Sequence, residues 1–422
     1  MEGLLKVGQV PAILHAEGEN MSKVILSFLG TGNYTPTQYR LDGKPYPDLS
    51  TPYTQEALLK RYEEEGWVLK VLMTKEAEEK HKEALAERVK YEAVLIPSGH
   101  TEGELWQIFN AIVDSIPEGA ELIMDISHGF RSQPILALAA VQFLQVVKGV
   151  RVRRILYGFY ERTTQGGNFF DLTGFLDLIE WTQATRDLLE HGEGLRLRKL
   201  LREIHSHSYQ VEGPKAKKLT SVGEALDNVE DALDLLRVEE ALSSAQELLK
   251  HLEAASEDVA QLPRSMPLGF LLERIRERYR SLAAKDFFSP EGIRAQGEML
   301  HLLLQTRRYA QAITLARELL VTLACVRQNW DPREERGVAE AWLNAKVKVR
   351  KKKKDFTEKD SQALRLISLW EETSDLRNDV AHAAMRENPA GARQLAQIVE
   401  KVCDRVRALL EDYPSWEEAG IG

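Results

Sequence analysis

The sequence predicts an α/β domain built on a parallel sheet, followed by two all-α regions. Two observations indicate this fold class. Short runs of β-branched and apolar residues alternate with amphipathic helical patterns as far as Phe159, and strands separated by helices are typical of a parallel sheet. From Asp171 onward the strand signal stops and only helical periodicity remains.

The expected elements of the first domain follow in order. Strands are expected at 23–29, 68–73, 93–96, 121–126 and 153–159, and helices at 55–65, 76–89, 102–116 and 134–147. A small β-hairpin around Asp42-Gly43-Lys44 should precede the first of these helices. Thr101 and Glu104 predict a capping box at the start of the third helix.

The rest of the chain reads as helices joined by short loops, which is typical of a helix bundle. We expect helical segments at 195–204, 222–254, 298–305, 309–328, 334–345, 358–376 and 389–411. The predicted organisation is an N-terminal extension at 1–20, the α/β domain at 21–170, a helical connector at 171–286 and a helical bundle at 287–422.

Composition bounds the protein class. A chain of 422 residues, 43% of them hydrophobic, is long enough for two or three domains. Two cysteines, Cys325 and Cys403, exclude a disulfide framework and fit a reducing cytosol. The apolar run Ile135–Val147 is too short to cross a bilayer, and the first twenty residues lack a secretory pattern. We therefore expect a cytoplasmic protein that makes no use of a membrane.

Three loops of the α/β domain, at 30–33, 97–101 and 127–133, carry glycine and polar residues at the ends of predicted strands. Ligands bind beyond the carboxyl ends of parallel strands, where helix N-termini gather. The third loop opens a helix, so its free N–H groups and Arg131 suit a phosphate. The candidate ligand-binding residues are Gly30, Thr31, Gly32, Asn33, Ser98, Gly99, His100, Ser127, His128, Gly129, Phe130, Arg131 and Ser132.

A second candidate site lies in the C-terminal bundle, where Arg377, Asn378 and His382 stand together. His can move the proton of a 2′-hydroxyl, Arg can hold phosphate charge, and Asn can orient either group. These residue types suit RNA cleavage without a metal. Arg202 and His207 show the same spacing, so spacing alone means little. The adjacent Asn and the small residue before His382 set the first group apart.

Charge patterning limits the nucleic-acid contacts. The net charge of −9 argues against a surface made for non-specific nucleic-acid binding, so any RNA contact must be local. The dense basic run that includes Lys351, Lys352, Lys353 and Lys354 is the RNA-binding candidate, and a solvated loop is the alternative. His205 and His207 lack a third ligand nearby, so no metal site is expected.

Four segments resemble the CARF/HEPN ribonucleases of type III CRISPR systems. Residues 27–34 and 122–132 are similar to the two CARF ligand motifs of that family, and 170–181 resembles the segment that leaves its sensor domain. The motif at 377–382 fits the HEPN Arg-x4-His pattern. The resemblance covers residues from about 21 to 422, and the connector helices are its least specific part.

The resemblance implies a Rossmann-like CARF sensor for cyclic oligoadenylate, with the tetra-adenylate favoured, and a HEPN bundle that cleaves single-stranded RNA. No cofactor is implied. A homodimer is expected because one motif offers a single titratable His, whereas the cleavage of RNA needs both a base and an acid.

Two other function classes compete with this interpretation. The first is a ligand-binding regulator whose helical half binds a partner without catalysis. The second is a nicotinamide-dependent enzyme, which lacks support because the third glycine of the dinucleotide fingerprint is missing. The acidic residue expected after the second strand is also absent, since Met73-Thr74-Lys75 stand there.

Overall fold

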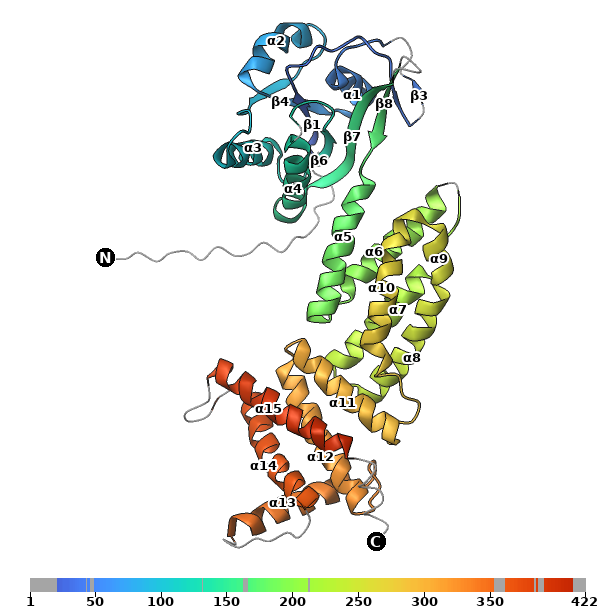
Figure 1. The fold of residues 1–422 in the computed structure, drawn as a ribbon, viewed down its shortest axis with the longest axis vertical. Coiled ribbons are helices and arrows are strands. Elements are labelled where there is room, and N and C mark those ends of the chain that lie inside the picture. The colour runs from blue at the N-terminus through green and yellow to red at the C-terminus, as the bar shows by residue number, and fades with distance from the viewer. Residues whose placement is uncertain are drawn as a thin grey trace, which may run out of the picture. The chain divides into compact units, whose positions relative to one another are not determined.

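The computed structural model describes residues 21–42, 44–45, 49–130, 132–161, 166–211, 213–352, 361–382, 385 and 391–412. The chain divides into two compact units, Met1–Leu176 and Asp177–Gly422. The first unit, referred to below as the sheet unit, is α/β, and the second, the helical unit, contains helices and no strand in its described part (Figure 1). The predicted fold class is therefore confirmed.

The sheet unit is built on an eight-stranded sheet with the order β3-β2-β8-β7-β6-β1-β4-β5. Five neighbouring strands, β7 to β5 in this order, run parallel. The strands are β1 Lys23–Leu29, β2 Tyr39–Leu41, β3 Lys44–Pro45, β4 Val68–Met73, β5 Glu92–Leu95, β6 Glu121–Asp125, β7 Arg151–Glu161 and β8 Gly166–Asp171.

The sheet is mixed rather than purely parallel, which corrects the prediction. β8 was not expected, and it pairs antiparallel with β7 from Leu156–Asp171 to Glu161–Gly166. β2 then pairs parallel with β8, and β2 with β3 forms the expected hairpin. The sequence of β8, Gly-Gly-Asn-Phe-Phe-Asp, begins with two glycines that weaken any strand pattern, so only pairing with β7 reveals it.

Helices cover both faces of the sheet, as βαβ crossovers require. They are α1 Thr54–Tyr62, α2 Lys75–Ala86, α3 Glu102–Ser115 and α4 Ser132–Val147. α1 and α2 share one apolar cluster with the sheet, and α3 and α4 share the other (Figure 1). Residues of β1 alternate between the two clusters, and each fully buried side chain such as Leu26 or Phe28 stabilises the fold by roughly 1.5–3 kcal/mol. This packing gives the strand ends a rigid base.

The helical unit contains eleven α-helices in its described residues when α5, which starts before the boundary, is included. They are α5 Gly174–Arg186, α6 Leu195–Gln210, α7 Leu219–Asp234, α8 Val238–Ala254, α9 Ser256–Gln261, α10 Met266–Arg280, α11 Pro290–Gln305, α12 Tyr309–Arg327, α13 Arg336–Lys352, α14 Ser361–Ala381 and α15 Ala392–Glu411. One apolar cluster runs through this unit from Trp181 to Leu410.

The helical segment expected at 222–254 is two helices, α7 and α8. They are separated at Leu235-Leu236-Arg237, where Leu236 adopts a left-handed conformation with φ of 53°. Helical periodicity continues on both sides of this turn, and no glycine or proline marks it, so the sequence pattern did not reveal the break.

α12 is long and apolar enough to cross a membrane by length and composition. However, 61% of the apolar window is buried inside the unit, and its residues pack against α11, α14 and α15. A core helix of a helical bundle has the same properties.

Candidate functional site

A cavity of about 250 Å³ lies beyond the carboxyl ends of β1, β4 and β6. It brings together the first and third loops that the sequence singled out. Its wall consists of Leu29, Gly30, Thr31, Gly32, Tyr34, Thr74, Ser127, His128, Gly129, Phe130 and Gln133. This is the position at which parallel α/β sheets bind ligands.

The two loops approach each other so closely that both need glycine. A Cβ atom at Gly30 would lie 3.1 Å from the backbone nitrogen of Gly129. Gly129 has a φ of 109°, and a Cβ there would lie 2.1 Å from Oε1 of Gln133. Only glycine combines this conformation with this contact. The paired glycines therefore shape the cavity.

A buried polar network fixes the start of the third loop. Asp125, fully buried at the end of β6, accepts hydrogen bonds from the hydroxyls of Ser27 (2.6 Å) and Thr54 (2.9 Å). It also accepts from the backbone nitrogen (3.0 Å) and the hydroxyl of Ser127. The Ser127 hydroxyl in turn accepts from the backbone nitrogen of Gly158 (2.6 Å). A buried carboxylate with this many donors is satisfied and holds the loop in one position.

α2 braces the first loop through two residues that the sequence analysis missed. Lys80 donates from Nζ to the carbonyl of Thr31 (2.7 Å) and to Oδ1 of Asn33 (2.7 Å). His81 contacts the carbonyl of Gly32 through Nε2 (3.0 Å), and its Nδ1 contacts the Tyr53 hydroxyl (3.2 Å). His81 is buried on the face of α2 that also buries Ala77 and Leu85, and that position was the available signal.

Aromatic rings form one wall of the cavity. The ring of Tyr34 packs against that of His128 with centroids 4.2 Å apart, and the His81 ring lies 5.0 Å from that of Tyr34. The Tyr34 hydroxyl accepts from the backbone nitrogen of Gly30 (3.1 Å). Burial raises the pKa of Tyr34 to about 12, so this hydroxyl keeps its proton at neutral pH.

His128 offers the cavity a neutral hydrogen-bonding group. Its Nε2 is buried and has no hydrogen-bond partner in the described residues. Burial lowers the pKa of His128, and the negative charge of Asp125 only partly opposes this effect. An aromatic wall with neutral polar groups suits a nucleobase, which stacks through its face and bonds through its edges.

The second loop plays a different part from the one expected. Thr101 caps α3 as predicted, since its hydroxyl accepts from the Glu104 nitrogen (3.2 Å). The Glu104 carboxylate, however, accepts from the backbone nitrogens of Gly99 (2.9 Å) and His100 (2.7 Å) instead of Thr101. These two N–H groups are therefore engaged within the loop.

Several candidate residues do not line the cavity. Those in the described part of the chain are Asn33, Ser98, Gly99, His100 and Ser132. The His100 ring does contact Phe130, with centroids 5.9 Å apart, so the second loop supports the third. Arg131 lies outside the described residues.

The lowered pKa of His128 predicts a pH dependence of stability. Because the folded state holds this pKa below the ordinary value of about 6.5, the unfolded state binds the proton more readily. His128 therefore contributes stability above about pH 6.5 that is lost as the pH falls. We expect the thermal midpoint to drop between pH 7.5 and 5.5, and to drop less in His128→Asn. An equal drop in both proteins would contradict this assignment.

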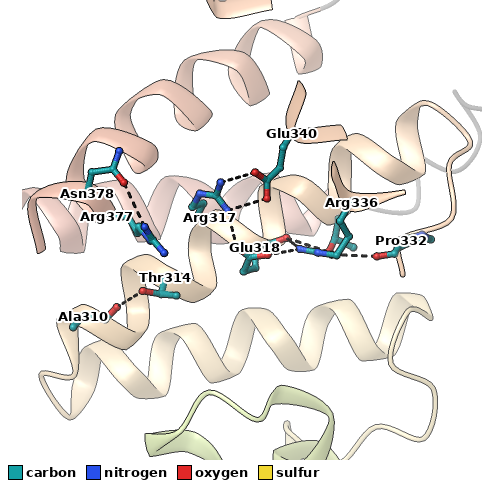
Figure 2. Close-up of polar contacts among 10 residues, drawn as sticks. Ala310, Thr314, Arg317, Glu318, Pro332, Arg336, Glu340, Arg377 and Asn378 are labelled. Carbon is teal, nitrogen blue, oxygen red and sulfur yellow. Dashed lines mark hydrogen bonds and ion pairs between the residues drawn. The ribbon is translucent and has the colours of Figure 1, made fainter. Parts of the chain in front are cut away.

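The second candidate site lies at the C-terminal end of α14. Arg377 is half-buried, and Asn378 and His382 are exposed. Nη1 of Arg377 lies 3.4 Å from Oδ1 of Asn378, and Figure 2 shows the guanidinium extending on the side of α14 where Thr314 of α12 lies. α14 ends at Ala381, but the His382 nitrogen still donates to the Asn378 carbonyl (3.0 Å). The three residues thus share one helix end.

A cation on α12 anchors α14 in place. Arg317 pairs with Glu340 of α13 (2.9 Å) and lies over the ring of Trp370 of α14, 4.7 Å from its centroid (Figure 2 shows the ion pair). The Trp370 indole donates to Oδ1 of Asn344 on α13 (3.0 Å). These contacts therefore hold α12, α13 and α14 together in the part of α14 that precedes Arg377.

The basic run is partly tied to the same helix. Lys351 and Arg350 pair with Glu371 of α14, at 2.9 Å and 3.5 Å. Lys352 is exposed at the end of α13, and Lys353 and Lys354 lie outside the described residues. The run therefore begins beside α14 rather than in a separate loop.

The competing motif behaves as an ordinary helix face. Arg202 pairs with Glu224 (3.9 Å), and His207 lies in the last turn of α6. Within the part of the chain that the structure describes, no group of three or more His, Cys, Asp or Glu residues is placed to hold a metal ion.

One known protein family matches the sheet unit. Residues 24–160 match the family described as the CARF domain of the CRISPR system endoribonuclease Csx1. Residues 24–160 therefore form a CARF domain. The cavity and both of its loops lie inside the matched range, so the site described above belongs to the CARF domain.

The helical unit also matches in part. Residues 177–284 match the second domain of the CRISPR-associated protein MJ1674. The Methanocaldococcus jannaschii protein of that name is 26% identical over 112 residues, which are 25% of this chain and 18% of that protein. The aligned region thus spans less than a fifth of the relative.

A solved structure covers more of the chain. Enterococcus italicus Csm6 bound to cyclic hexa-2′-fluoro-hexa-dAMP covers 95% of this chain and 98% of its own, with 10% identity and a TM-score of 0.41.

Proposed function

We propose that this CARF protein is a single-stranded RNA endoribonuclease that a cyclic oligoadenylate switches on in type III CRISPR defence. The observation that carries the sensor half is the cavity between the Gly30 and Gly129 loops, within the range that matches a CARF domain. Its neutral His128 and its protonated Tyr34 hydroxyl suit the edges of an adenine, and the Tyr34 ring suits its face. The cyclic tetra-adenylate is the ligand we favour.

The catalytic half of the proposal rests on the exposed end of α14. A 2′-hydroxyl would attack the adjacent phosphorus as its proton leaves, and the 5′-oxygen would depart as it gains a proton, giving a 2′,3′-cyclic phosphate. His382 would transfer one of these protons. Arg377, beside Asn378, would stabilise the charge on the phosphate oxygens in the transition state.

One copy of the motif supplies a single histidine, so the proposal includes a homodimer. The second copy would provide the other proton-transfer group, with both motifs facing a shared cleft. All of the chemistry is assigned to side chains, and no step uses a metal.

The deciding experiment incubates labelled single-stranded RNA with the protein and EDTA, with and without cyclic tetra-adenylate or cyclic hexa-adenylate. We expect cleavage in EDTA that depends on one of the two ligands. Strong cleavage without ligand would contradict the sensor coupling, and loss of cleavage in EDTA would contradict the metal-free mechanism. Absence of cleavage under every condition would favour the alternative, a ligand-binding regulator with a non-catalytic helical half.

A smaller effect is expected from the basic run. Replacing Lys351, Lys352, Lys353 and Lys354 with glutamine should weaken RNA binding and flatten its dependence on salt. Each lost phosphate contact on single-stranded RNA lowers the slope of log K against log salt by about 0.7. Fluorescence anisotropy across a salt series measures both quantities. Lys250→Gln on α8, where the lysine pairs with Glu247 on its own helix, is the control, and an unchanged slope in the quadruple variant would identify the run as a solvated segment.

A further inference from the structure

A π-helical turn, Asp187–His191, continues α5 and ends at Gly192. Such turns are rare and occur frequently at functional sites. Gly192 has a φ of 70°, and a Cβ atom there would lie 3.1 Å from Oε2 of Glu230 on α7. Glycine therefore lets this turn approach a carboxylate that is buried in the helical unit.

Arg308 joins the π-helical turn to the start of α12. It is the N-cap residue of α12, and its side chain is 13% exposed. Its Nη2 donates to the carbonyl of Gly192 (3.0 Å) and to Oε2 of Glu230 (3.2 Å), and its Nη1 donates to the same Oε2 (3.2 Å). Its Nε pairs with Asp234, one turn further along α7 (3.0 Å). One guanidinium therefore bridges three elements.

The other oxygen of Glu230 is held by a buried tyrosine. Tyr279 of α10 is fully buried, and its hydroxyl donates to Oε1 of Glu230. Gly192, Glu230 and Tyr279 lie within the range 177–284 that matches the MJ1674 second domain, whereas Arg308 lies beyond it. We call these four residues the Glu230 network. Through it, the bundle that carries α14 is tied to the preceding helices by a buried ion pair.

The part of α12 that follows Arg308 lies beside the candidate catalytic end of α14. Thr314 is six residues after Arg308, which is about 9 Å along a helix axis. Figure 2 shows the guanidinium of Arg377 extending on the side of α14 where Thr314 lies. Arg317, three residues further on, lies over the ring of Trp370 of α14. Arg308 and Arg317 therefore fix the two ends of this part of α12.

A second ion pair joins the same two parts of the chain but does not involve the start of α12. Arg333, between α12 and α13, pairs with Glu239 of α8 (3.0 Å). Their side chains are 57% and 62% exposed, and exposed pairs contribute little to stability or position. Arg333 is therefore a matched control for Arg308.

We propose that Arg308 is a positioning residue for RNA cleavage, because its bridge from Gly192 and Glu230 to the start of α12 holds the support on which Arg377 lies. A misplacement of about 1 Å at a reacting group can lower a rate about a hundredfold. The effect on cleavage rests on the proposed function, but the effect on α12 and α14 is testable without RNA.

The first test is the single-turnover cleavage rate of Arg308→Gln. It uses saturating RNA and whichever of cyclic tetra-adenylate and cyclic hexa-adenylate activates the wild type, at a temperature well below the thermal midpoint of every variant. We expect a rate at least about tenfold lower with RNA affinity within about twofold. A purely structural role would lower the midpoint and leave the rate of the folded protein unchanged. Arg333→Gln should keep the wild-type rate within about twofold.

Two further variants separate charge from geometry. Arg308→Lys keeps a charge beside Glu230, so it should recover part of the thermal midpoint, but its rate should stay low because an ammonium lacks the fork of donors. Combining Glu230→Gln with Arg308→Gln removes both buried charges, so this protein should fold even if Arg308→Gln does not. It still lacks the bridge to Gly192, and a wild-type rate in it would overturn the proposal.

The second test is hydrogen exchange of the full chain without RNA or nucleotide. Backbone amides at 309–316 and 372–381 should exchange at least about tenfold faster in Arg308→Gln than in the wild type, and at the wild-type rate in Arg333→Gln. Unchanged exchange at 372–381 in Arg308→Gln would contradict the positioning role. If the wild type cleaves no RNA, the proposed function is wrong, and this exchange alone decides whether Arg308 holds the end of α14.

Discussion

Replacing His382 with alanine should lower ligand-activated RNA cleavage by at least about a hundredfold. Proton transfer by a positioned side chain contributes roughly 10²–10⁴-fold to such a reaction. His382 is exposed just beyond the last residue of α14, so its removal leaves no cavity in the core. The measurement is the single-turnover rate with saturating ligand, together with the thermal midpoint, which should stay within the error of the wild type.

Arg377→Ala should lower the same rate by a similar factor, since removal of one group that stabilises transition-state charge costs about 10²–10³-fold. Arg377→Lys should recover only part of the loss, because lysine keeps the charge but lacks the planar fork of donors. The matched control is His207→Ala, which removes the histidine of the competing motif on α6. If His207→Ala abolishes cleavage and His382→Ala does not, the catalytic motif is that of Arg202 and His207.

The sequence predicted the sheet unit well because its signals are local. Strands such as β1 and β4 are mostly apolar runs bounded by turns, and their ends in the structure agree with the predicted ends. The loops after them were recognised because glycines and polar residues follow apolar runs directly. β8 was not predicted because its pairing with β7 stabilises it, and such pairing is a tertiary effect.

The candidate site was predicted less completely, for a related reason. The loops of Gly30 and Gly129 were both expected beyond the carboxyl ends of parallel strands, and they do line one cavity there. Lys80 and His81 contact the first loop across nearly fifty positions of sequence, and no local sequence pattern indicates these contacts. Gln133 lies at the end of the third loop, but its role depends on its buried amide oxygen, which accepts a hydrogen bond from the Phe130 nitrogen (3.1 Å).

The candidate site at the end of α14 shows a different limit of prediction from sequence. The predicted helix at 358–376 stopped just before Arg377, whereas α14 extends to Ala381 and carries Arg377 and Asn378. The sequence also did not show that the next residue, Asp379, is buried. Nor did it indicate that Arg317 of α12 would pack over the ring of Trp370 and hold α14 in place. Spacing identifies the residues of such a motif, whereas packing decides how rigidly they are held.

Gly129→Ala should raise the ligand concentration for half-maximal activation by about a hundredfold. The new Cβ would lie 2.1 Å from Oε1 of Gln133, which is 2% exposed and accepts from the Phe130 nitrogen at 3.1 Å. Either the loop shifts or the Gln133 side chain turns into the cavity, and the hydrogen bond to the Phe130 nitrogen breaks in both cases.

The size of this effect follows from the free energy that ligand binding must supply to restore the original conformation of the Gly129 loop. A side chain at a φ of 109° costs of order 1–3 kcal/mol, and the lost hydrogen bond about 1 kcal/mol more. If the free loop relaxes and the ligand requires the original shape, this energy is taken from binding, and about 2.7 kcal/mol corresponds to a hundredfold change in affinity. The control is Gly119→Ala, which has a φ of 66° but nothing within 4 Å of its Cβ. It carries similar backbone strain away from the cavity, so its thermal midpoint should fall while its ligand response stays that of the wild type. Equal ligand responses in the two variants would show that the Gly129 loop does not form the binding site.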